Sequence, residues 1–496
     1  TGYELYGEES SSFLCEIMIL PINYYTDTFA VTQRQLEELA GIAVAGGGTY
    51  SDLYFENTFT IDLLLRDGEV SSGASNIDYG VGIRTLKGEK TGYAYAQTTD
   101  MASMKDAARA AAAISRSHVG LEMEPTATRT FRGRPNAEAD RYGIKNDWRT
   151  CESGDLVPVL KRLEELIQGK DSRIIKVIGM LSCQTSDIMM YNSLGELKYE
   201  TRPLGTIAVS VIFSDGKSVR NNHISKSFRM GVEMLTDDLL KDIAAEAVRN
   251  IDDRFAAKRP KGGKMPVVMG AGASGILLHE AMGHAFEADF NRKGQSVFAG
   301  RLGTKICNEN ISIVDDGTIR YNRGSLNFDD EGVPAQRTYM VKDGILTSYL
   351  HDRISAKYYD VTPTGNGRRE SFRYSPLPRM RATYMENGNS DPESIIASVK
   401  KGIFVGEFAN GQVKIGEGDF TFYVKSGYMI ENGRLTQPVK DINISGNGPQ
   451  ALADIVAVGN DAKIDDGAWT CGKEQNVPVS CGIPTVLVNN LIVGGN

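Results

Sequence analysis

The segment Leu277–Glu287 of this 496-residue chain carries the side chains best suited to chemistry. It contains His279, Glu280 and His284, and therefore two of only five histidines in the sequence. Neutral imidazoles bind zinc, and a carboxylate can accept the proton of a water molecule that the metal acidifies. A single helical histidine is more often structural, but two histidines flanking a glutamate are less easily assigned to packing. We interpret this segment as a candidate metal site.

The spacing of the two histidines is unusual. The pattern His-Glu-x-x-x-His is one residue longer than the His-Glu-x-x-His of zinc peptidases. At about 100° per residue, positions five apart lie roughly 140° apart around an ideal α-helix. Both rings can reach one ion only if the helix widens or ends between them. The sequence therefore predicts a π-type bulge or a helix end near Gly283, which precedes the second histidine.

Two histidines leave a zinc ion one protein ligand short of the usual catalytic set. Residue types leave several candidates open for that ligand: Glu287, Asp289, Cys307, His351, Cys471 and Cys481. Cys471 lies in an expected Gly-flanked loop between β segments, where a thiolate could be exposed and the nearby Lys473 would favour it. Cys481 has a similar context, and most free cysteines are simply small buried residues. The residues alone do not choose between the two thiols.

The composition is that of a globular protein, with 41% hydrophobic and 24% charged residues. The net charge of −8 argues against nonspecific nucleic-acid binding, which needs a basic surface. No stretch has the length of a transmembrane helix, so no membrane partner is expected. The six cysteines are widely scattered and do not resemble a disulfide framework. A cytoplasmic location is expected, with export left open because the first residue is Thr1.

A Pro-, Gly- and Lys-rich segment, 258–264, is the best domain boundary in the chain. It divides the sequence into an N-terminal extension (1–30), an N-terminal α+β domain (31–260) and a C-terminal β-rich catalytic domain (261–496). Amphipathic helices are expected in the α+β domain at 32–45, 101–116, 155–169 and 235–257. Strands are expected there at 51–56, 58–65, 80–85, 91–96, 174–183, 188–192 and 205–214, which predicts an antiparallel sheet with packed helices.

The C-terminal domain is rich in turn signals such as Asp343–Gly344 and Asn432–Gly433. Their close spacing is typical of antiparallel β structure and predicts a curved sheet or a barrel that carries the metal-site helix. The fold class expected for the whole chain is therefore α+β.

A glycine-rich segment, 270–275, lies between an expected strand at 265–269 and the histidine segment. It matches the Gly-x-Gly-x-x-Gly pattern of dinucleotide-binding folds. Those folds continue into a second parallel strand that ends in an acidic residue, whereas residues 292–303 look like a loop. We interpret the glycines as a tight turn that lets a helix approach closely, and no nucleotide cofactor is expected.

The segment 279–292 resembles the TldD/PmbA metallopeptidase family, once described as modulators of DNA gyrase. The resemblance covers most of the chain except residues 1 to about 30. It rests further on these segments: Tyr54–Phe55, Asn76–Gly82, Gly88–Gly92, Gly365–Ser371, Pro378–Met380, Val458–Asp461, Cys471–Lys473 and Val493–Gly495. The chain departs from the family pattern at Gln475–Asn476 and at Cys481, which affects the expected loop shape and not the expected ligands.

The resemblance implies a zinc-dependent peptidase. His279, His284 and Cys471 match the family's Zn²⁺ ligands, and Glu280 matches its catalytic glutamate. The implied substrates are unfolded or extended peptides lying along a strand edge. The family also implies a homodimer, or a heterodimer with a related subunit that lacks these residues. This chain keeps all four residues and so resembles the catalytic kind of subunit.

Two arginines are candidates for substrate binding. Arg379 could stabilise a developing oxyanion, although a structural role is the simpler expectation. Arg369, with Arg368 and Arg373, could bind a peptide carboxylate, or the three could form an internally paired cluster. The remaining histidines, His118, His223 and His351, are expected to be structural.

Two other functions compete with the peptidase interpretation. One is a non-catalytic peptide-binding or regulatory subunit in which the metal site is structural. The other is a regulator associated with gyrase, which the acidic net charge would limit to protein contacts rather than DNA contacts. A closed shell of four protein ligands would favour the binding protein, and an open position at the metal would favour the enzyme.

Overall fold

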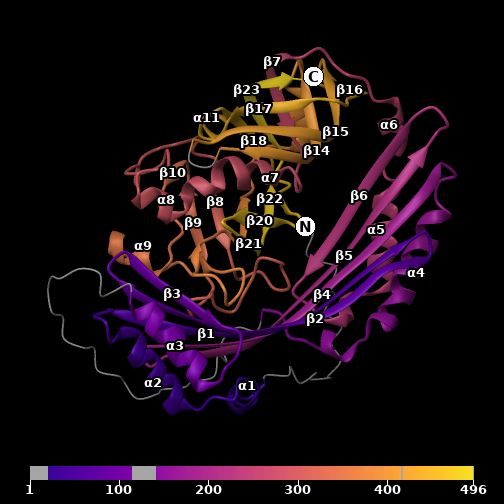
Figure 1. The fold of residues 1–496 in the computed structure, drawn as a ribbon. Helices are drawn as coiled ribbons and strands as arrows, with labels where there is room; N and C mark the ends of the chain where they lie inside the picture. Colours follow the sequence, from indigo (N-terminus) through magenta and orange to yellow (C-terminus); the bar gives the residue numbers. More distant parts are fainter. Residues whose placement is uncertain (1–19, 114–140, 415–416, 495–496) are drawn as a thin grey trace, which may run out of the picture.

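The computed structural model describes residues 20–113, 141–414 and 417–494 and has the α+β fold expected from the sequence. Long strands and their helices form the N-terminal part, and the C-terminal part lies against the inner side of this curved sheet (Figure 1). His118 and residues 1–19 of the expected extension lie outside the described residues. The expected domain bounds, 31–260 and 261–496, remain predictions.

The N-terminal part is organised around one six-stranded antiparallel sheet with the order β3-β2-β1-β4-β5-β6. Its strands are β1 (Tyr50–Arg66), β2 (Glu69–Lys87), β3 (Lys90–Ala96), β4 (Ile174–Asn192), β5 (Leu197–Ser214) and β6 (Val219–Phe228). Four of them are 17 to 19 residues long. The sheet therefore reaches across the whole molecule, from α2 and α3 at one end to α4 and α5 at the other (Figure 1).

Two helical layers cover the two ends of the sheet and create two separate cores. At one end α1 (Ile22–Thr28), α2 (Gln33–Val44) and α3 (Met101–Ala113) bury side chains such as Leu39 and Phe55. At the other end α4 (Ser153–Gln168) and α5 (Asp237–Val248) pack on side chains such as Leu63. Two short 3₁₀ turns, η2 (Trp148–Thr150) and η3 (Val232–Met234), adjoin this second core.

One expected helix, 235–257, is wrong as a single element. It is divided into α5 and α6 (Ile251–Ala256) because Asn250 adopts a left-handed conformation with φ of 58°. Asparagine is among the few residues that tolerate this conformation, so the chain turns there without large strain.

The C-terminal part contains a closed five-stranded barrel. Its strands are β7 (Gly263–Met269), β14 (Lys401–Val413), β15 (Asp419–Glu431), β17 (Asn443–Asn447) and β23 (Val486–Gly494), extended by β16 (Arg434–Pro438) and β18 (Ile455–Val458). Two short helices, α10 (Pro392–Ala397) and α11 (Gly448–Ala453), pack beside it. The expectation of a curved sheet or barrel is thereby confirmed.

A second sheet in the C-terminal part has the order β10-β9-β8-β13-β22-β19. Its strands are β8 (Ile313–Asp316), β9 (Arg337–Lys342), β10 (Ile345–Leu346), β13 (Ala382–Met385), β19 (Lys463–Ile464) and β22 (Ser480–Ile483). Two small hairpins join β11 (Gly367–Arg368) to β12 (Leu377–Pro378) and β20 (Thr470–Lys473) to β21 (Gln475–Pro478). The helices α8 (Ala288–Arg292) and α9 (Arg353–Tyr359) complete this part.

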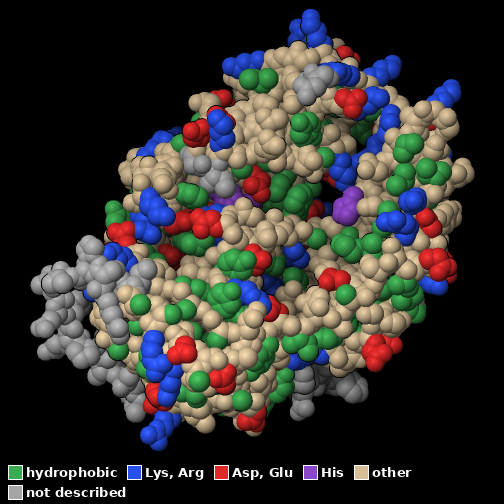
Figure 2. All heavy atoms as spheres, in the orientation of Figure 1, with side chains coloured by type: hydrophobic (Ala, Val, Ile, Leu, Met, Phe, Trp, Pro, Cys, Tyr) green, Lys and Arg blue, Asp and Glu red, His purple; other side chains and the backbone are tan. Residues whose placement is uncertain are grey.

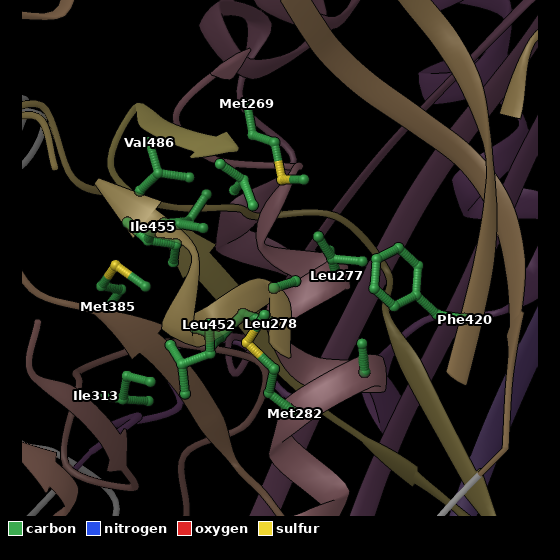
Figure 3. Close-up of a cluster of buried hydrophobic side chains, with 14 of the residues drawn as sticks. Met269, Leu277, Leu278, Met282, Ile313, Met385, Phe420, Leu452, Ile455 and Val486 are labelled. Atoms are coloured by element: carbon green, nitrogen blue, oxygen red, sulfur yellow. The ribbon is translucent and has the colours of Figure 1, made fainter. Parts of the chain in front are cut away.

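The helix that carries the histidines is anchored in the core shared by the barrel and the second sheet. Leu277, Leu278 and Met282 point into this core, where they join Met269 of β7 and Leu452 of α11 (Figure 3). Burial of a large apolar side chain stabilises a fold by about 1.5–3 kcal/mol. The apolar face of the segment therefore fixes the position of the opposite, polar face.

Buried ion pairs join the N-terminal sheet to the C-terminal part. Arg84 of β2 lies 2.7 Å from Glu331, and Arg202 of β5 lies 2.5 Å from Asp330. The Tyr93 hydroxyl also donates to the carbonyl of Phe372 at 2.6 Å. A buried charge that loses its partner destabilises a protein strongly, so these contacts hold the two parts in one arrangement.

Within the described residues, no helix combines the length and the apolar character needed to span a membrane. The cysteines at positions 151, 183, 307, 471 and 481 are all free thiols.

Candidate metal centre

The helix widens where the histidine spacing predicts it. One α-helical turn, α7 (Gly275–Leu277), leads into a π-helical segment, η4 (Leu278–Met282), which is followed by a 3₁₀ segment, η5 (Gly283–Phe286). The predicted π-type bulge near Gly283 is confirmed. The extra width brings the His279 and His284 rings to a centroid distance of 5.4 Å, so both face the same space.

Glycine at position 283 is needed for a different reason than conformational freedom. Its φ of −61° and ψ of −45° are ordinary helical values that any residue adopts. A Cβ at this position would lie 2.3 Å from Sδ of Met380, and a Cβ on Gly448 would lie 2.0 Å from the Ala281 carbonyl oxygen. These two glycines allow the neighbouring elements to approach the widened helix closely.

The third member of the cluster is Cys471, which lies buried on strand β20 and not in the exposed loop that the sequence indicated. Its Sγ lies 3.4 Å from Nε2 of His284, and one atom each of His279, His284 and Cys471 lie within 4.8 Å of one another. All three residues are at most 2% exposed. In the part of the chain that the structure describes, they form the one group of three residues placed to share a metal ion. The other proposed third ligands are not members of this group.

The three side chains shift one another's proton affinities. Burial raises the pKa of the Cys471 thiol, but the neighbouring His279 and His284 more than offset this and lower it to about 4. Burial alone would lower the pKa of His284, yet Glu287 and the Cys471 thiolate raise it to about 10. The pKa of His279 also rises, because the thiolate outweighs desolvation. The thiolate form of Cys471 and the protonated form of His284 therefore stabilise each other.

The donor set fits a divalent metal ion. Both ring nitrogens of His279 are buried and have no hydrogen-bond partner among the described residues, which is costly unless a ligand satisfies them. Two imidazoles and one thiolate are ligands that zinc binds readily, and three protein ligands are typical of a zinc site with an open position. The arrangement is therefore suited to an ion that holds a further ligand.

Glu280 lies beside the Nε2 atoms of both rings. Its carboxylate oxygens are 4.0 Å from Nε2 of His279 and 3.8 Å from Nε2 of His284. Its side chain is 26% exposed, whereas the neighbouring His279 ring is fully buried. A carboxylate with this position could reach a water molecule on an ion held by these nitrogens and still contact solvent.

Glu287 and Lys473 contact the cluster on the Nδ1 side of His284, opposite the Nε2 atom that faces Cys471. Nδ1 of His284 lies 2.8 Å from Oε2 of Glu287, and Lys473 Nζ donates to the same oxygen at 2.9 Å. Sequence reasoning missed the role of Glu287 as a partner of His284 and placed Lys473 beside the thiolate. The structure corrects this, since Lys473 Nζ also donates to Asp289 at 2.8 Å and pairs with carboxylates.

Family models match three stretches of the chain. They are described as PmbA/TldA metallopeptidase domain 1 for residues 51–115, the central domain for 148–254 and the C-terminal domain for 262–495. A metalloprotease TldD homolog from Haemophilus influenzae is 38% identical over 452 residues, which is 90% of this chain and 93% of that protein. The chain belongs to the PmbA/TldD family of metallopeptidases.

Relatives of this family occur in distant organisms. A metalloprotease from Methanothermobacter thermautotrophicus is 28% identical over 90% of this chain and 95% of its own length. The crystal structure of a protein named a modulator of a DNA gyrase, from Thermotoga maritima, shares the fold with a TM-score of 0.73 and 24% identity over 93% of this chain and all of that one. TldE from Thermococcus kodakarensis also shares the fold, with a TM-score of 0.70 and 19% identity. The match covers 93% of this chain and 100% of TldE. Membership of the family implies a metal-dependent peptidase.

The two arginines expected to bind substrate are both buried. Arg379 donates to the carbonyl oxygens of Cys471 at 2.7 Å and Gln475 at 2.8 Å, and so ties both strands of the β20–β21 hairpin. The Arg369 guanidinium lies 4.2 Å from the Tyr54 ring centroid and donates to the Asp330 carbonyl at 2.9 Å. These contacts favour the structural alternatives considered for both arginines, and their roles toward substrate remain predictions.

The described histidines outside the cluster make local contacts. His351 is buried, its Nδ1 lies 3.3 Å from the Ser355 hydroxyl, and burial lowers its pKa to about 4. His223 is exposed on β6, with Nδ1 2.9 Å from the Ser210 hydroxyl. Neither ring lies in the metal cluster.

Metal affinity is expected to rise as the pH is raised from 7 to about 10. The upper limit is the raised pKa of His284. A metal ligand must be deprotonated, and at pH 7 the thiol has already lost its proton while His284 has not. Binding at pH 7 should therefore release at least about one proton, from imidazole and not from the thiol. Calorimetry in buffers of different ionisation enthalpy measures this number, and binding without proton release would contradict the assignment.

Proposed function

We propose that this chain is a zinc-dependent peptidase that hydrolyses unfolded or extended peptides. His279, His284 and Cys471 would hold Zn²⁺, and Glu280 would act as the general base in a His-Glu-x-x-x-His site. The observation that carries the proposal is the convergence of the two imidazoles and the thiolate within 4.8 Å, with the Glu280 carboxylate about 4 Å from both rings.

The chemistry requires one proton acceptor and one Lewis acid. When bound, zinc would supply the Lewis acidity that acidifies a water molecule and polarises a peptide carbonyl. Glu280 accepts the proton of the attacking water and later delivers it to the leaving amine. Glu287 holds the Nδ1 side of His284 and so leaves Nε2 as the nitrogen that would hold the metal ion.

The number of available ligands favours the enzyme over a structural metal site. In the described chain the cluster has three protein members, whereas structural zinc sites usually have four. Besides Glu280, the proposed base, the segment offers the Glu287 carboxylate, which is taken up by His284 Nδ1 and Lys473. This arrangement leaves a position for water or substrate and supports the catalytic interpretation over the peptide-binding alternative.

A cleft of about 620 Å³ adjoins the elements that supply the ligands. It lies between β6 and the barrel, where the surface is hollowed (Figure 2). Its lining includes residues 271–273, directly before α7, and Trp469, two residues before Cys471. This cleft is the proposed path of an extended peptide toward the metal.

The wall of the cleft formed by β6 offers a sheet edge to such a peptide. Among the described strands β6 pairs with β5, and its outer edge is taken near its end by the Ser227 N–H bond to the Asp466 carbonyl and by a bridge from Phe228 to Asn322. Its residues 221–226 line the cleft. The His223 carbonyl accepts a hydrogen bond from Lys425 Nζ at 3.0 Å. This contact shows that the carbonyl points away from β5. An added strand would find the backbone groups of His223 directed toward it.

Replacement of His223 by proline should weaken peptide binding and leave the metal site intact. Proline is tolerated on an edge strand where the N–H points outward, but it removes the donor that an added strand needs. The loss of one such hydrogen bond is worth about 1 kcal/mol, and with the steric hindrance of the ring we expect KM to rise about tenfold. Steady-state kinetics on an extended peptide measure the change.

The matched control is His223→Ala, which removes the side chain and keeps the N–H, and its KM should stay close to that of the unmodified protein. An unchanged KM in H223P, at normal metal content, would exclude β6 as the peptide edge.

The expected partner is a second subunit of the same fold. The likeness to TldE at 19% identity shows the shared fold and leaves the assembly, as homodimer or heterodimer, to be measured. Light scattering of the purified chain, alone and mixed with a related subunit, distinguishes the two forms.

Elemental analysis combined with a peptide-cleavage assay tests the proposed function. We expect about one zinc per chain, cleavage of unfolded peptides, loss of cleavage with a chelator and recovery with added zinc. A chain that carries one zinc but cleaves no peptide in any assembly would support the binding-protein alternative instead.

A further inference from the structure

A buried lysine connects the strand that supplies Cys471 to the helix that supplies the histidines. Lys473 is 3% exposed, and its Nζ donates to Glu287 at 2.9 Å, Asp289 at 2.8 Å and the Pro378 carbonyl at 3.2 Å. The same ammonium lies 4.4 Å from the Phe290 ring centroid. A buried ammonium requires such partners, since an unpaired one would be very costly.

Strand geometry places Lys473 on the same face of β20 as Cys471. Successive side chains of a strand point to opposite faces, so Cys471 and Lys473 share one face of β20 and Gly472 lies on the other. The burial of residues 470–473 alternates accordingly, with Cys471 and Lys473 buried and the two others exposed. The hairpin therefore contacts the histidine segment at two points, one thiolate and one ammonium.

The contacts of Lys473 close a ring of residues around the metal position. Lys473 and His284 bind the same oxygen of Glu287, at 2.9 Å and 2.8 Å. His284 in turn contacts the hairpin, since its Nε2 lies 3.4 Å from the Cys471 sulfur. A shift of the hairpin would change the Lys473 contact, the orientation of the His284 ring and the position of the thiolate together.

We propose that Lys473 is a positioning residue for the metal centre, which fixes the Cys471 strand and the His284–Glu287 pair in the geometry that one divalent ion requires. This inference rests on the metal site of the proposed function and adds a residue that touches neither ion nor substrate. Partners of this kind orient metal ligands, and their loss typically lowers metal affinity 10- to 100-fold.

The charges of the site support this role. The Glu287 and Asp289 carboxylates are both buried and both accept from the Lys473 ammonium, at 2.9 Å and 2.8 Å. A neutral replacement of Lys473 leaves the two carboxylates without their shared cation, so Glu287 loses the contact that holds it on His284.

The direct test compares zinc affinity in the full chain and in Lys473→Met, with zinc itself as the probe and a chromophoric chelator as the competitor. We expect K473M to bind zinc 10- to 100-fold more weakly. K473R keeps the charge and should recover most of the affinity. At saturating zinc, KM should be unchanged and kcat moderately lowered. Cobalt(II) loading should show a changed visible spectrum in K473M, which reports the ligand geometry directly.

Arg149→Met is a matched control, because the Arg149 guanidinium also joins two carboxylates, Asp147 and Asp187, each at 2.6 Å. This cation lies beside β4 of the N-terminal sheet. R149M should lower thermal stability and leave zinc affinity within about twofold of the unmodified protein. If R149M and K473M lose zinc affinity equally, Lys473 contributes only general stability and the proposal is overturned.

Asp289→Asn provides a milder variant in case K473M does not fold. It removes one of the two carboxylates on Lys473 and should weaken zinc binding severalfold in a folded protein. Unchanged zinc affinity in D289N or in folded K473M would overturn the positioning role. Absence of zinc binding by the unmodified chain would instead overturn the proposed function, so the two failures are distinguishable.

Discussion

Replacement of Cys471 by alanine is expected to lower zinc affinity by more than about 100-fold, beyond the range typical of changes outside the ligand shell. The thiolate lies 3.4 Å from His284 Nε2, and two imidazoles alone are a poor site for zinc. Peptide hydrolysis should fall with the metal content. Competition with a chelator measures the affinity, and elemental analysis measures the zinc retained after purification.

Cys481→Ala is the matched control for this experiment. Cys481 is also a buried thiol on a strand of the C-terminal part, but it is not a member of the metal cluster. Burial raises the pKa of Cys481, whereas that of Cys471 is lowered to about 4, so the two thiols differ in charge at neutral pH. C481A should bind zinc normally. Normal zinc affinity in C471A would refute the ligand assignment.

Replacement of Glu280 by glutamine is expected to reduce kcat by about 10²- to 10⁴-fold while zinc remains bound. Glutamine is nearly isosteric with glutamate and cannot accept the proton of the attacking water. The proposed ligands are unchanged in this variant, so the zinc content should equal that of the unmodified protein. Single-turnover cleavage of an extended peptide, with zinc quantified in the same sample, separates the two effects.

A suitable control for E280Q is Glu386→Gln. Its side chain is 29% exposed, similar to the 26% of Glu280, and it pairs with Arg337 outside the metal cluster. E386Q should retain full activity. If E280Q hydrolysed peptides at the normal rate, another group would have to serve as the base.

The widened helix could be predicted from the sequence because it follows from geometry. Two histidines five residues apart cannot reach one ion from a regular α-helix, and the structure has a π-helical segment over Leu278–Met282. Gly283 correctly marked the position of the distortion. A glycine is needed there because Met380 packs against it closely, and not because the backbone angles are unusual. A constraint of this kind depends on a few consecutive residues, so it can be predicted from the sequence.

The third ligand could not be derived from residue types. Cys471 and Cys481 have similar sequence contexts, and only the family resemblance separated them. Cys471 meets a histidine 187 residues away, through a hairpin whose position depends on contacts across the whole C-terminal part. The Lys473–Glu287 contact was missed for the same reason, although the alternation of Cys471 and Lys473 along a strand already placed them on one face.

Two long strands, β1 and β4, were each wrongly predicted as two shorter strands because polar residues lie in their middle. Strands expected at 51–56 and 58–65 are one strand, β1, because Asn57 between them pairs in register with Tyr79 of β2 and Asp187 of β4. Segments 174–183 and 188–192 are likewise one strand, β4, in which Asp187 is buried against Arg149. Such residues look like turn signals until the partners that satisfy them are known.

The measurement that tests the account most directly is X-ray absorption at the zinc edge of the metal-loaded chain. We predict one sulfur neighbour at about 2.3 Å and two imidazole nitrogens at about 2.0–2.1 Å, with a further light atom from water. The sulfur signal should disappear in C471A. A zinc environment made only of nitrogen and oxygen, or one with two or more sulfur neighbours, would contradict the proposed metal centre.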